Sequence, residues 1–172
     1  KSKYYKSKKI LSSLKIDTIK LKYKEGLALI NGTQFSTAYA VDCLVSLKRL
    51  VKIADIAGAL STEGLMGTDK AFLEKVNKLK LHKGQLDVAS NLINLLKDSE
   101  IRDSHIDCER VQDMYSIRCM PQVHGASRDS IDHACRVIEN EVNSISDNPL
   151  IFPDGDVISS GNFHAESVAQ AM

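Results

Sequence analysis

The sequence contains no tryptophan, and aromatic residues make up only 5% of its 172 residues. No apolar run approaches the roughly 18 residues that a membrane-spanning helix needs. The formal net charge is only +1, so no global field favours nucleic acid or an acidic partner. We therefore expect neither a membrane nor a nucleic-acid partner. Apolar residues at 43% and charged residues at 26% are typical of an ordinary globular protein, and the length fits one domain.

Paired cysteine motifs are also missing. The four cysteines are Cys43, Cys108, Cys119 and Cys135. None forms a Cys-Xaa-Xaa-Cys pair, so a zinc site is not expected. The His164-Ala-Glu166 sequence matches half of the zinc-deaminase signature, but the Pro-Cys-Xaa-Xaa-Cys half is absent. We expect buried free thiols in a reducing compartment, which predicts a cytoplasmic protein without a metal cofactor.

The first 24 residues are rich in lysine. They contain nine lysines and one acid, Asp17. Such a segment could be a basic arm for nucleic acid or a membrane surface. No aromatic stacking platform accompanies the lysines, although Tyr4 and Tyr5 are adjacent. We interpret residues 1–24 as a solvated flank with one short helix over residues 8–14.

Apolar residues at helical spacing predict two long helices. The first spans residues 33–59, follows the turn dipeptide Asn31-Gly32, and frays between Gly58 and Gly64. Its apolar positions step by three, four and three residues: Leu44, Leu47, Val51 and Ala54. The second helix spans residues 121–146 and begins with a proline in its first turn. Its stripe consists of Ile131, Ala134, Val137, Ile138, Val142 and Ile145.

Shorter elements fill the rest of the chain. In chain order they are a loop at residues 61–69, a short helix at 70–78 capped by Thr68 or Asp69, a helix at 84–97, a polar linker at 98–110, a β-hairpin at 150–159 around Asp154-Gly155, and a helix from near His164. The inner face of the 84–97 helix consists of Leu86, Ala89, Leu92, Ile93 and Leu96. No strand–helix alternation occurs, so we predict an all-α fold of long helices that need partners to cover their apolar stripes.

One stretch concentrates the groups that bind small acids. It reads Gln112-Asp-Met-Tyr115-Ser-Ile-Arg118-Cys-Met-Pro121-Gln122. In a helix, steps of three would bring Gln112, Tyr115 and Arg118 to one broad side. Arginine suits a carboxylate because its guanidinium is a fork, and the tyrosine hydroxyl can donate or accept a hydrogen bond. The stretch predicts a site for a small amino or keto acid.

Each candidate residue also has a purely structural interpretation. Arg118 could pair with Asp113 or Asp129 on the surface, and Tyr115 could be the edge of the core. Asn31 before Gly32 is usually a turn former, Asn148 before Pro149 a helix stop, and Phe163 a core residue. Taken singly these interpretations are the stronger ones. They weaken when the residues are considered together with their order along the chain.

Three ordered blocks resemble the aromatic amino-acid ammonia-lyases, and among them the histidine ammonia-lyases. The blocks are Glu25-Gly-Leu-Ala-Leu-Ile-Asn31-Gly-Thr-Gln34, the Gln112–Gln122 stretch, and Ser146-Asp-Asn148-Pro149 with Gly161-Asn-Phe163-His164-Ala-Glu166. The resemblance covers about residues 24–172 and is weakest over residues 66–105. It implies a long-helix bundle of the ammonia-lyase and fumarase–aspartase type that assembles as a homotetramer.

The resemblance also implies a reaction and a role for each matched residue. The family eliminates ammonia from an α-amino acid with a methylidene-imidazolone electrophile, which forms from an internal Ala-Ser-Gly. By matched position, the implied catalytic residues are Asn31 at the electrophile's carbonyl, Tyr115 beside electrophile and substrate, and Phe163 against the electrophile or the substrate ring. The implied substrate-binding residues are Arg118 on the carboxylate, Asn148 assisting it, and Gln112 in the polar network.

One departure from the family pattern is clear. The sequence has no Ala-Ser-Gly, and its nearest match is Gly125-Ala126-Ser127-Arg128. We therefore expect the chain to be one partial domain, the central segment of a longer lyase whose electrophile lies outside it. Such a segment is expected to be inactive alone.

The motif details favour L-histidine as the substrate, with urocanate as the product. His164 and the Tyr115–Arg118 sequence resemble histidine lyases more than the plant phenylalanine enzymes. Phenylalanine or tyrosine ammonia-lyases and aminomutases share much of the pattern and remain an alternative. Another alternative is a non-catalytic, truncated helical assembly module.

Overall fold

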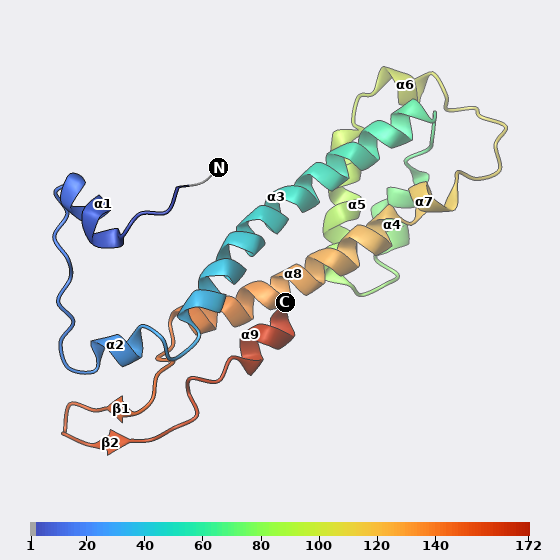
Figure 1. Cartoon of the computed structure of the whole chain (residues 1–172). Helices are drawn as coiled ribbons and strands as arrows, with labels where there is room; N and C mark the ends of the chain where they lie inside the picture. The colour runs from blue at the N-terminus through green and yellow to red at the C-terminus, as the bar shows by residue number, and fades with distance from the viewer. Residues whose placement is uncertain (1–2) are drawn as a thin grey trace. The chain divides into compact units, whose positions relative to one another are not determined.

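The computed structural model describes residues 3–172 and is helical apart from one two-stranded sheet (Figure 1). The helices are α1 (Ser7–Ser13), α2 (Glu25–Ala28), α3 (Gln34–Gly64), the 3₁₀ turn η1 (Lys70–Phe72), α4 (Glu74–Asn77), α5 (Lys83–Leu95), α6 (Glu100–Asp103), α7 (Tyr115–Arg118), α8 (Met120–Val142) and α9 (Glu166–Ala171). The strands β1 (Leu150–Ile151) and β2 (Val157–Ile158) pair antiparallel. The predicted all-α class with a small hairpin is confirmed.

The chain divides into two compact units. Unit 1 comprises Lys1–Gly32 and Ser146–His164, and unit 2 comprises Thr33–Ile145 and Ala165–Met172. The prediction of one partial domain with a lysine-rich flank stays a prediction. Helix α1 lies within one residue of the helix expected over residues 8–14.

Helices α3, α5 and α8 form the body of unit 2, and α9 packs on α8 and α3. Helices α5 and α8 approach each other closely at two glycines. A Cβ added to Gly84 would lie 2.2 Å from the backbone oxygen of Gly125, and one added to Gly125 would lie 2.4 Å from the backbone nitrogen of Gln85. Asp129 strengthens this crossing because its carboxylate accepts a 2.8 Å hydrogen bond from the Gly84 N–H.

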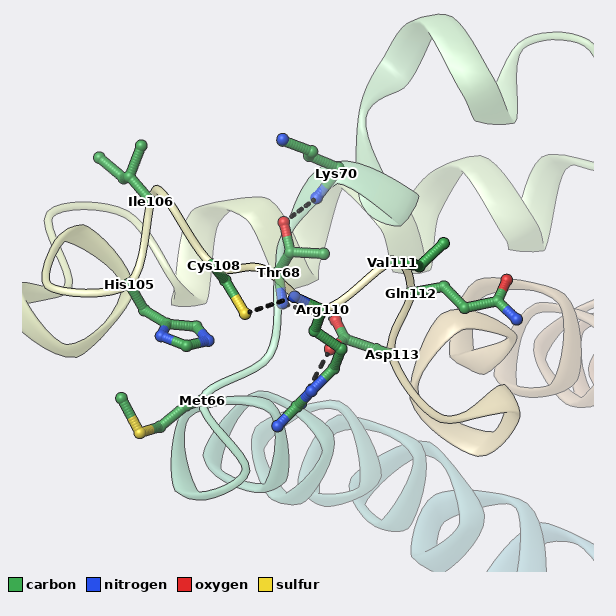
Figure 2. Close-up of a pocket in the computed structure, with 10 residues that line it drawn as sticks. All are labelled: Met66, Thr68, Lys70, His105, Ile106, Cys108, Arg110, Val111, Gln112 and Asp113. Carbon is green, nitrogen blue, oxygen red and sulfur yellow. Dashed lines mark hydrogen bonds and ion pairs between the residues drawn. The ribbon is translucent and has the colours of Figure 1, made fainter.

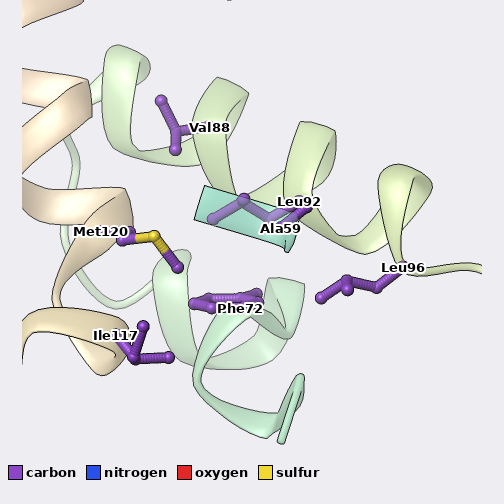
Figure 3. Close-up of a cluster of buried hydrophobic side chains, with 7 residues drawn as sticks. All are labelled: Ala59, Phe72, Val88, Leu92, Leu96, Ile117 and Met120. Atoms are coloured by element: carbon purple, nitrogen blue, oxygen red, sulfur yellow. The ribbon is translucent and has the colours of Figure 1, made fainter. Parts of the chain in front are cut away.

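The core of unit 2 consists of two apolar clusters. The α5 cluster contains Ala59, Phe72, Val88, Leu92, Leu96, Ile117 and Met120 (Figure 3). The α3–α8 cluster contains Ala40, Leu44, Ala134, Ile138 and Val168. The α5 cluster joins α3, η1 and α5 to the segment around α7, so it fixes the end of unit 2 that carries the acid-binding stretch.

A buried polar cluster also ties the long helices of unit 2 together. Asp55 on α3 is only 2% exposed. Its carboxylate oxygens lie 2.5 Å from Nη2 of Arg128 and 3.0 Å from Nδ1 of His124, and both of these residues are on α8. The carboxylate also accepts a 3.1 Å hydrogen bond from Asn91 on α5. A buried charge needs such partners, so these contacts fix the register of α3 against α8.

Unit 1 is held by polar contacts at the base of its hairpin. The ammonium of Lys24 lies 2.5 Å from the Asp147 carboxylate and 2.5 Å from the Pro149 carbonyl oxygen. Gly155 has a φ of 97°, the left-handed conformation that the Asp154-Gly155 turn requires. The sequence predicted this hairpin correctly.

The predicted end of the first long helix is wrong. Helix α3 continues to Gly64, through the first part of the segment expected to form a loop, residues 61–69. Gly58 lies inside the helix, and a Cβ there would lie 2.5 Å from the Met120 sulfur. The glycine allows α8 to approach closely, and the Thr62 hydroxyl donates a hydrogen bond to the Gly58 carbonyl one turn earlier.

Other boundaries also need correction. The helix expected at residues 70–78 is two short pieces, because Leu73 has an extended ψ of 139°. Helix α8 ends at Val142, four residues earlier than expected. The predicted polar linker contains the short helix α6, capped by Ser99. The inner face predicted for α5 omitted Val88, which is fully buried.

The thiols differ from the expected burial. Cys43 and Cys108 are exposed, Cys119 and Cys135 are half-buried, and all four are free. Within residues 3–172, no helix is both long and apolar enough to cross a membrane.

Candidate active site

The acid-binding stretch does not form one helix. Helix α7 covers only Tyr115–Arg118, because Met114 before it has an extended ψ of 146°. Gln112 therefore precedes the helix, and the predicted helical spacing of Gln112 with Tyr115 and Arg118 is wrong. Tyr115 and Arg118 do share one side of α7, three residues apart as expected.

Arg118 is half-buried and held at two points. Its Nε donates a 2.9 Å hydrogen bond to the backbone oxygen of Asp113. Its guanidinium carbon lies 5.9 Å from the centre of the Tyr115 ring, within reach of a cation–π interaction. No other hydrogen bond to this guanidinium is found in the described part of the chain, so both terminal nitrogens can take a ligand. Such a fork suits a carboxylate.

Asp113 anchors the stretch to the loop after α3. Its carboxylate accepts a 2.6 Å hydrogen bond from the Thr68 N–H and lies 3.3 Å from Nη1 of Arg110 (Figure 2). Both partners line the same small pocket of about 90 Å³. Gln112 also lines this pocket, whereas Tyr115 and Arg118 do not.

The other three candidate residues belong to unit 1. The side-chain oxygen of Asn148 accepts hydrogen bonds from the Ser160 N–H at 2.8 Å and the Ser159 hydroxyl at 3.1 Å. Asn31 is half-buried, and Phe163 is 44% exposed. No hydrogen bond joins Asn31 to Asn148 among the described residues of unit 1.

The structure also bears on the purely structural interpretations. Tyr115 is 75% exposed and Phe163 is 44% exposed, so neither is a core residue. Arg118 binds the backbone oxygen of Asp113 rather than its carboxylate, so the proposed surface ion pair is absent there. Asn31 precedes Gly32, whose φ of 89° is that of a turn, so the turn-forming interpretation of Asn31 fits.

A charged aspartate, Asp147, precedes Asn148 in the sequence. The neighbouring Asp147 accepts hydrogen bonds from the Lys24 ammonium and from the Asn148 N–H at 2.7 Å. These contacts hold the pKa of Asp147 below its ordinary value of 3.8, the Lys24 hydrogen bond being the larger cause. Because it binds Lys24 and Asn148 as an anion, Asp147 fixes the backbone on which Asn148 sits.

Two residues of the stretch received no functional role from the sequence. Asp113 links the stretch to Thr68, and Gln122 has an enclosed side-chain oxygen without a hydrogen-bond partner among the described residues. Their position inside the motif, next to residues with assigned roles, is the sequence feature that could have indicated a role for both. Among residues 3–172, no group of three or more metal-ligating side chains is found.

Comparison with known proteins adds a family to this geometry. A family model described as aromatic amino acid lyase matches residues 1–172. A histidine ammonia-lyase of Myxococcus xanthus is 46% identical over 167 residues, which is 96% of this chain and 33% of that protein. This chain spans about a third of the length of the curated relatives that it matches.

Solved structures agree with this match. The histidine ammonia-lyase of Trypanosoma cruzi superposes with a TM-score of 0.85 at 40% identity, covering 98% of this chain and 31% of that one. A tyrosine aminomutase of Streptomyces globisporus superposes with a TM-score of 0.84 at 32% identity, covering 95% of this chain and 35% of that one. Both neighbours share the helical fold of this chain. The chain belongs to the aromatic amino acid lyase family, as the three motif blocks predicted.

Proposed function

We propose that this chain forms part of the active site of a histidine ammonia-lyase, which converts L-histidine to urocanate and ammonia. The observation that carries the proposal is the Arg118 guanidinium. It is fixed by the Asp113 backbone oxygen at 2.9 Å, lies beside the Tyr115 ring, and keeps both terminal nitrogens for a ligand. This arrangement suits the carboxylate of an amino acid.

Each of the other candidate residues has a separate task in this proposal. Tyr115, with its exposed ring, contacts the substrate and the electrophile. Asn148 contributes a second donor for a carboxylate, and its amide nitrogen remains able to donate because only its oxygen is engaged by the hairpin. Gln112 extends the polar network, and Phe163 packs against the substrate ring or the electrophile.

The family cofactor fits the donors that this chain offers. Methylidene-imidazolone supplies an electrophile that activates the substrate amine for departure. The Asn31 backbone N–H donates a 2.9 Å hydrogen bond to the Leu27 carbonyl, and its side-chain amide can donate to the carbonyl oxygen of that group. A donor aimed at developing negative charge stabilises it without reorganisation.

The electrophile itself, we propose, comes from polypeptide outside this chain. The closest match to Ala-Ser-Gly is Gly125-Ala126-Ser127-Arg128, which lies inside helix α8. Gly125 is buried against the backbone of Gln85, so this segment has no freedom to cyclise. The chain alone is therefore expected to be inactive.

A homotetramer in the cytoplasm completes the proposal. Helix α3 carries large apolar side chains that are more than half exposed: Phe35 79%, Tyr39 63%, Leu50 56%, Ile53 57% and Leu60 63%. Exposed apolar side chains of this size along one helix favour an interaction surface. The four free cysteines fit a reducing compartment.

Histidine is preferred over tyrosine or phenylalanine for a specific reason. The TM-scores of 0.85 and 0.84 do not separate the histidine lyase from the aminomutase, because both share the fold. Sequence identity does separate them, at 40% against 32%. Substrate choice depends on side chains rather than on the fold, so the identity is the better guide.

The experiment that tests this function is a chimera. This chain replaces the matched segment of the Myxococcus xanthus enzyme, and urocanate formation from L-histidine is followed by absorbance beside the unfused chain. We expect turnover by the chimera and none by the chain alone. In the chimera, Arg118→Gln should lower kcat/KM by about a hundredfold, the loss expected for charge-assisted hydrogen bonds. The matched control is Arg136→Gln, an exposed arginine on α8.

Three outcomes would contradict parts of the proposal. Urocanate from the unfused chain would place the electrophile within it. A folded, tetrameric chimera that acts on tyrosine or phenylalanine instead would change the substrate. A folded chimera without any lyase activity would indicate a non-catalytic assembly module.

A further inference from the structure

We propose that Asp113 is a positioning residue, which fixes the Arg118 guanidinium in the orientation that binds a substrate carboxylate. The inference rests on the proposed function for the identity of the ligand. Asp113 acts through two groups at once. Its carboxylate is anchored in the protein, and its backbone oxygen holds Arg118.

The anchor is a buried carboxylate with defined partners. Asp113 is 8% exposed, although both of its sequence neighbours are exposed. One carboxylate oxygen accepts a 2.6 Å hydrogen bond from the Thr68 N–H, and the other lies 3.3 Å from Nη1 of Arg110 (Figure 2). Burial of a carboxylate is costly without such partners, so the side chain has little freedom to leave this position.

The loop that receives the carboxylate is shaped for it. A Cβ added to Gly67 would lie 3.3 Å from the Asp113 carboxylate and 3.1 Å from Thr62. Any larger side chain at this position would therefore crowd the anchor. The Gly67 N–H donates a 2.7 Å hydrogen bond to the carbonyl of Thr62, which is buried in α3, so the loop that holds the anchor is tied to the long helix.

The consequence appears at the backbone of the same residue. With the side chain of Asp113 fixed, its peptide carbonyl can turn only over a small range. That carbonyl accepts the hydrogen bond from Nε of Arg118 at 2.9 Å, and the Tyr115 ring lies on the guanidinium at 5.9 Å. A long arginine side chain loses much rotamer freedom when it binds a ligand. Holding it beforehand removes that loss from the binding step.

This arrangement differs from a salt bridge between Asp113 and Arg118. A carboxylate bound to the guanidinium would compete with the substrate carboxylate for the same terminal nitrogens. Here the carboxylate of Asp113 faces Thr68 and Arg110, and only Nε of Arg118 is engaged. Removal of Asp113 should therefore weaken ligand binding, whereas loss of a competing salt bridge would strengthen it.

The first test is hydrogen exchange of the Arg118 Nε–H, measured by NMR on the folded chimera. We expect the wild-type signal to exchange at least about tenfold more slowly than that of exposed Arg136, because the hydrogen bond to Asp113 protects it. Asp113→Ala should abolish the protection. Asp113→Asn should keep part of it, since an amide oxygen still accepts from Thr68. Asp107→Asn, an exposed neighbour in the same loop, should change nothing.

The second test separates positioning from stability. In the chimera, Asp113→Ala should raise KM for L-histidine about tenfold and change kcat by less than about threefold, with partial rescue in Asp113→Asn. An unprotected wild-type Nε–H overturns the inference even if every variant fails to fold. An unchanged or lowered KM in folded Asp113→Ala also overturns it.

Failure of the proposed function would look different. An Nε–H that is protected in the wild type and exposed in Asp113→Ala, in a chimera that does not act on histidine, would support the positioning role. The same result would reject the proposed substrate.

Discussion

The two units of this chain are stabilised by different kinds of interaction. Every buried hydrophobic side chain among the described residues belongs to unit 2, from Ala40 on α3 to Val168 on α9. In the described part of unit 1, Ser146 is the one buried residue, and the hairpin base is held by Lys24, Asp147 and Pro149. Burial of apolar area supplies most folding free energy, so unit 2 should hold most of the stability of the chain.

The candidate residues are divided in the same way. Gln112, Tyr115 and Arg118 belong to unit 2, and Asn31, Asn148 and Phe163 belong to unit 1. The carboxylate-binding arginine is thus attached to an apolar core. The unit 1 residues depend on hydrogen bonds, which contribute less net stability and open more easily. The comparison can be tested by changes that affect one unit and leave the other unchanged.

The largest effect is expected from Phe72→Ala in the α5 cluster. Phe72 is fully buried, and its loss leaves a cavity among Leu92, Ile117 and Met120. We expect the free energy of unfolding to fall by about 3–5 kcal/mol. Urea denaturation followed by circular dichroism measures it. Leu81→Ala, at a position 94% exposed, should cost less than about 0.5 kcal/mol. Equal losses at the two positions would refute the core described here.

A smaller loss is expected from Gly84→Ala at the α5–α8 crossing. The new Cβ would lie 2.2 Å from the Gly125 oxygen and 2.8 Å from the Asp129 carboxylate. The helices must separate, which should cost about 1–3 kcal/mol. Gly64→Ala is the matched control, because a Cβ there meets nothing within 4 Å. Its thermal midpoint should be unchanged or higher, and a stable Gly84→Ala variant would contradict the close crossing.

The sequence predicted those parts of the fold that depend on local patterns. Apolar spacing predicted α3, α5 and α8, and the Asp154-Gly155 turn predicted the hairpin. The prediction from sequence failed at Gly58, because a glycine that allows Met120 to approach is indistinguishable in sequence from a glycine that ends a helix. It also failed at Gln112, because the extended backbone of Met114 interrupts a spacing that looked helical.

The candidate site was predictable only in its list of residues. The family pattern named Tyr115 and Arg118, and the structure brings their side chains together. The role of Asp113 could not be read from the sequence, because its partner Thr68 is 45 residues away along the chain. Contacts between distant segments depend on the packing of α3 and α5, which the local pattern does not contain.

A local effect confined to unit 1 is expected from Lys24→Met. The substitution keeps the side-chain length but removes the hydrogen bonds to Asp147 and to the Pro149 carbonyl. Amide hydrogen exchange should speed up at Asn148 and Ser160, while the urea midpoint of unit 2 stays the same. The matched control is Lys20→Met, an exposed lysine of the same flank. If α3 and α8 amides also lost protection, the two units would not be energetically separate.

The smallest effect is a pH dependence that differs in direction between the units. The Lys24 ammonium and the Asn148 N–H lower the pKa of Asp147 below 3.8, so this contact stabilises unit 1 above that pH and is lost as the pH falls through the folded pKa. In unit 2, the hydrogen bond to Asp87 raises the pKa of Lys83 above 10.5. That contribution is present below 10.5 and is lost as the pH rises through the folded value.

NMR titration of both side chains measures this difference directly. Acid should release the hairpin base as Asp147 is protonated, whereas alkali should release the pair on α5 as Lys83 loses its proton. Because the pair is exposed, its loss should be barely detectable in the stability of unit 2. In Lys24→Met the pKa of Asp147 should return toward 3.8. An Asp147 pKa that stays low without Lys24 would assign the shift to the Asn148 N–H, and the hairpin base would then be held by its own backbone.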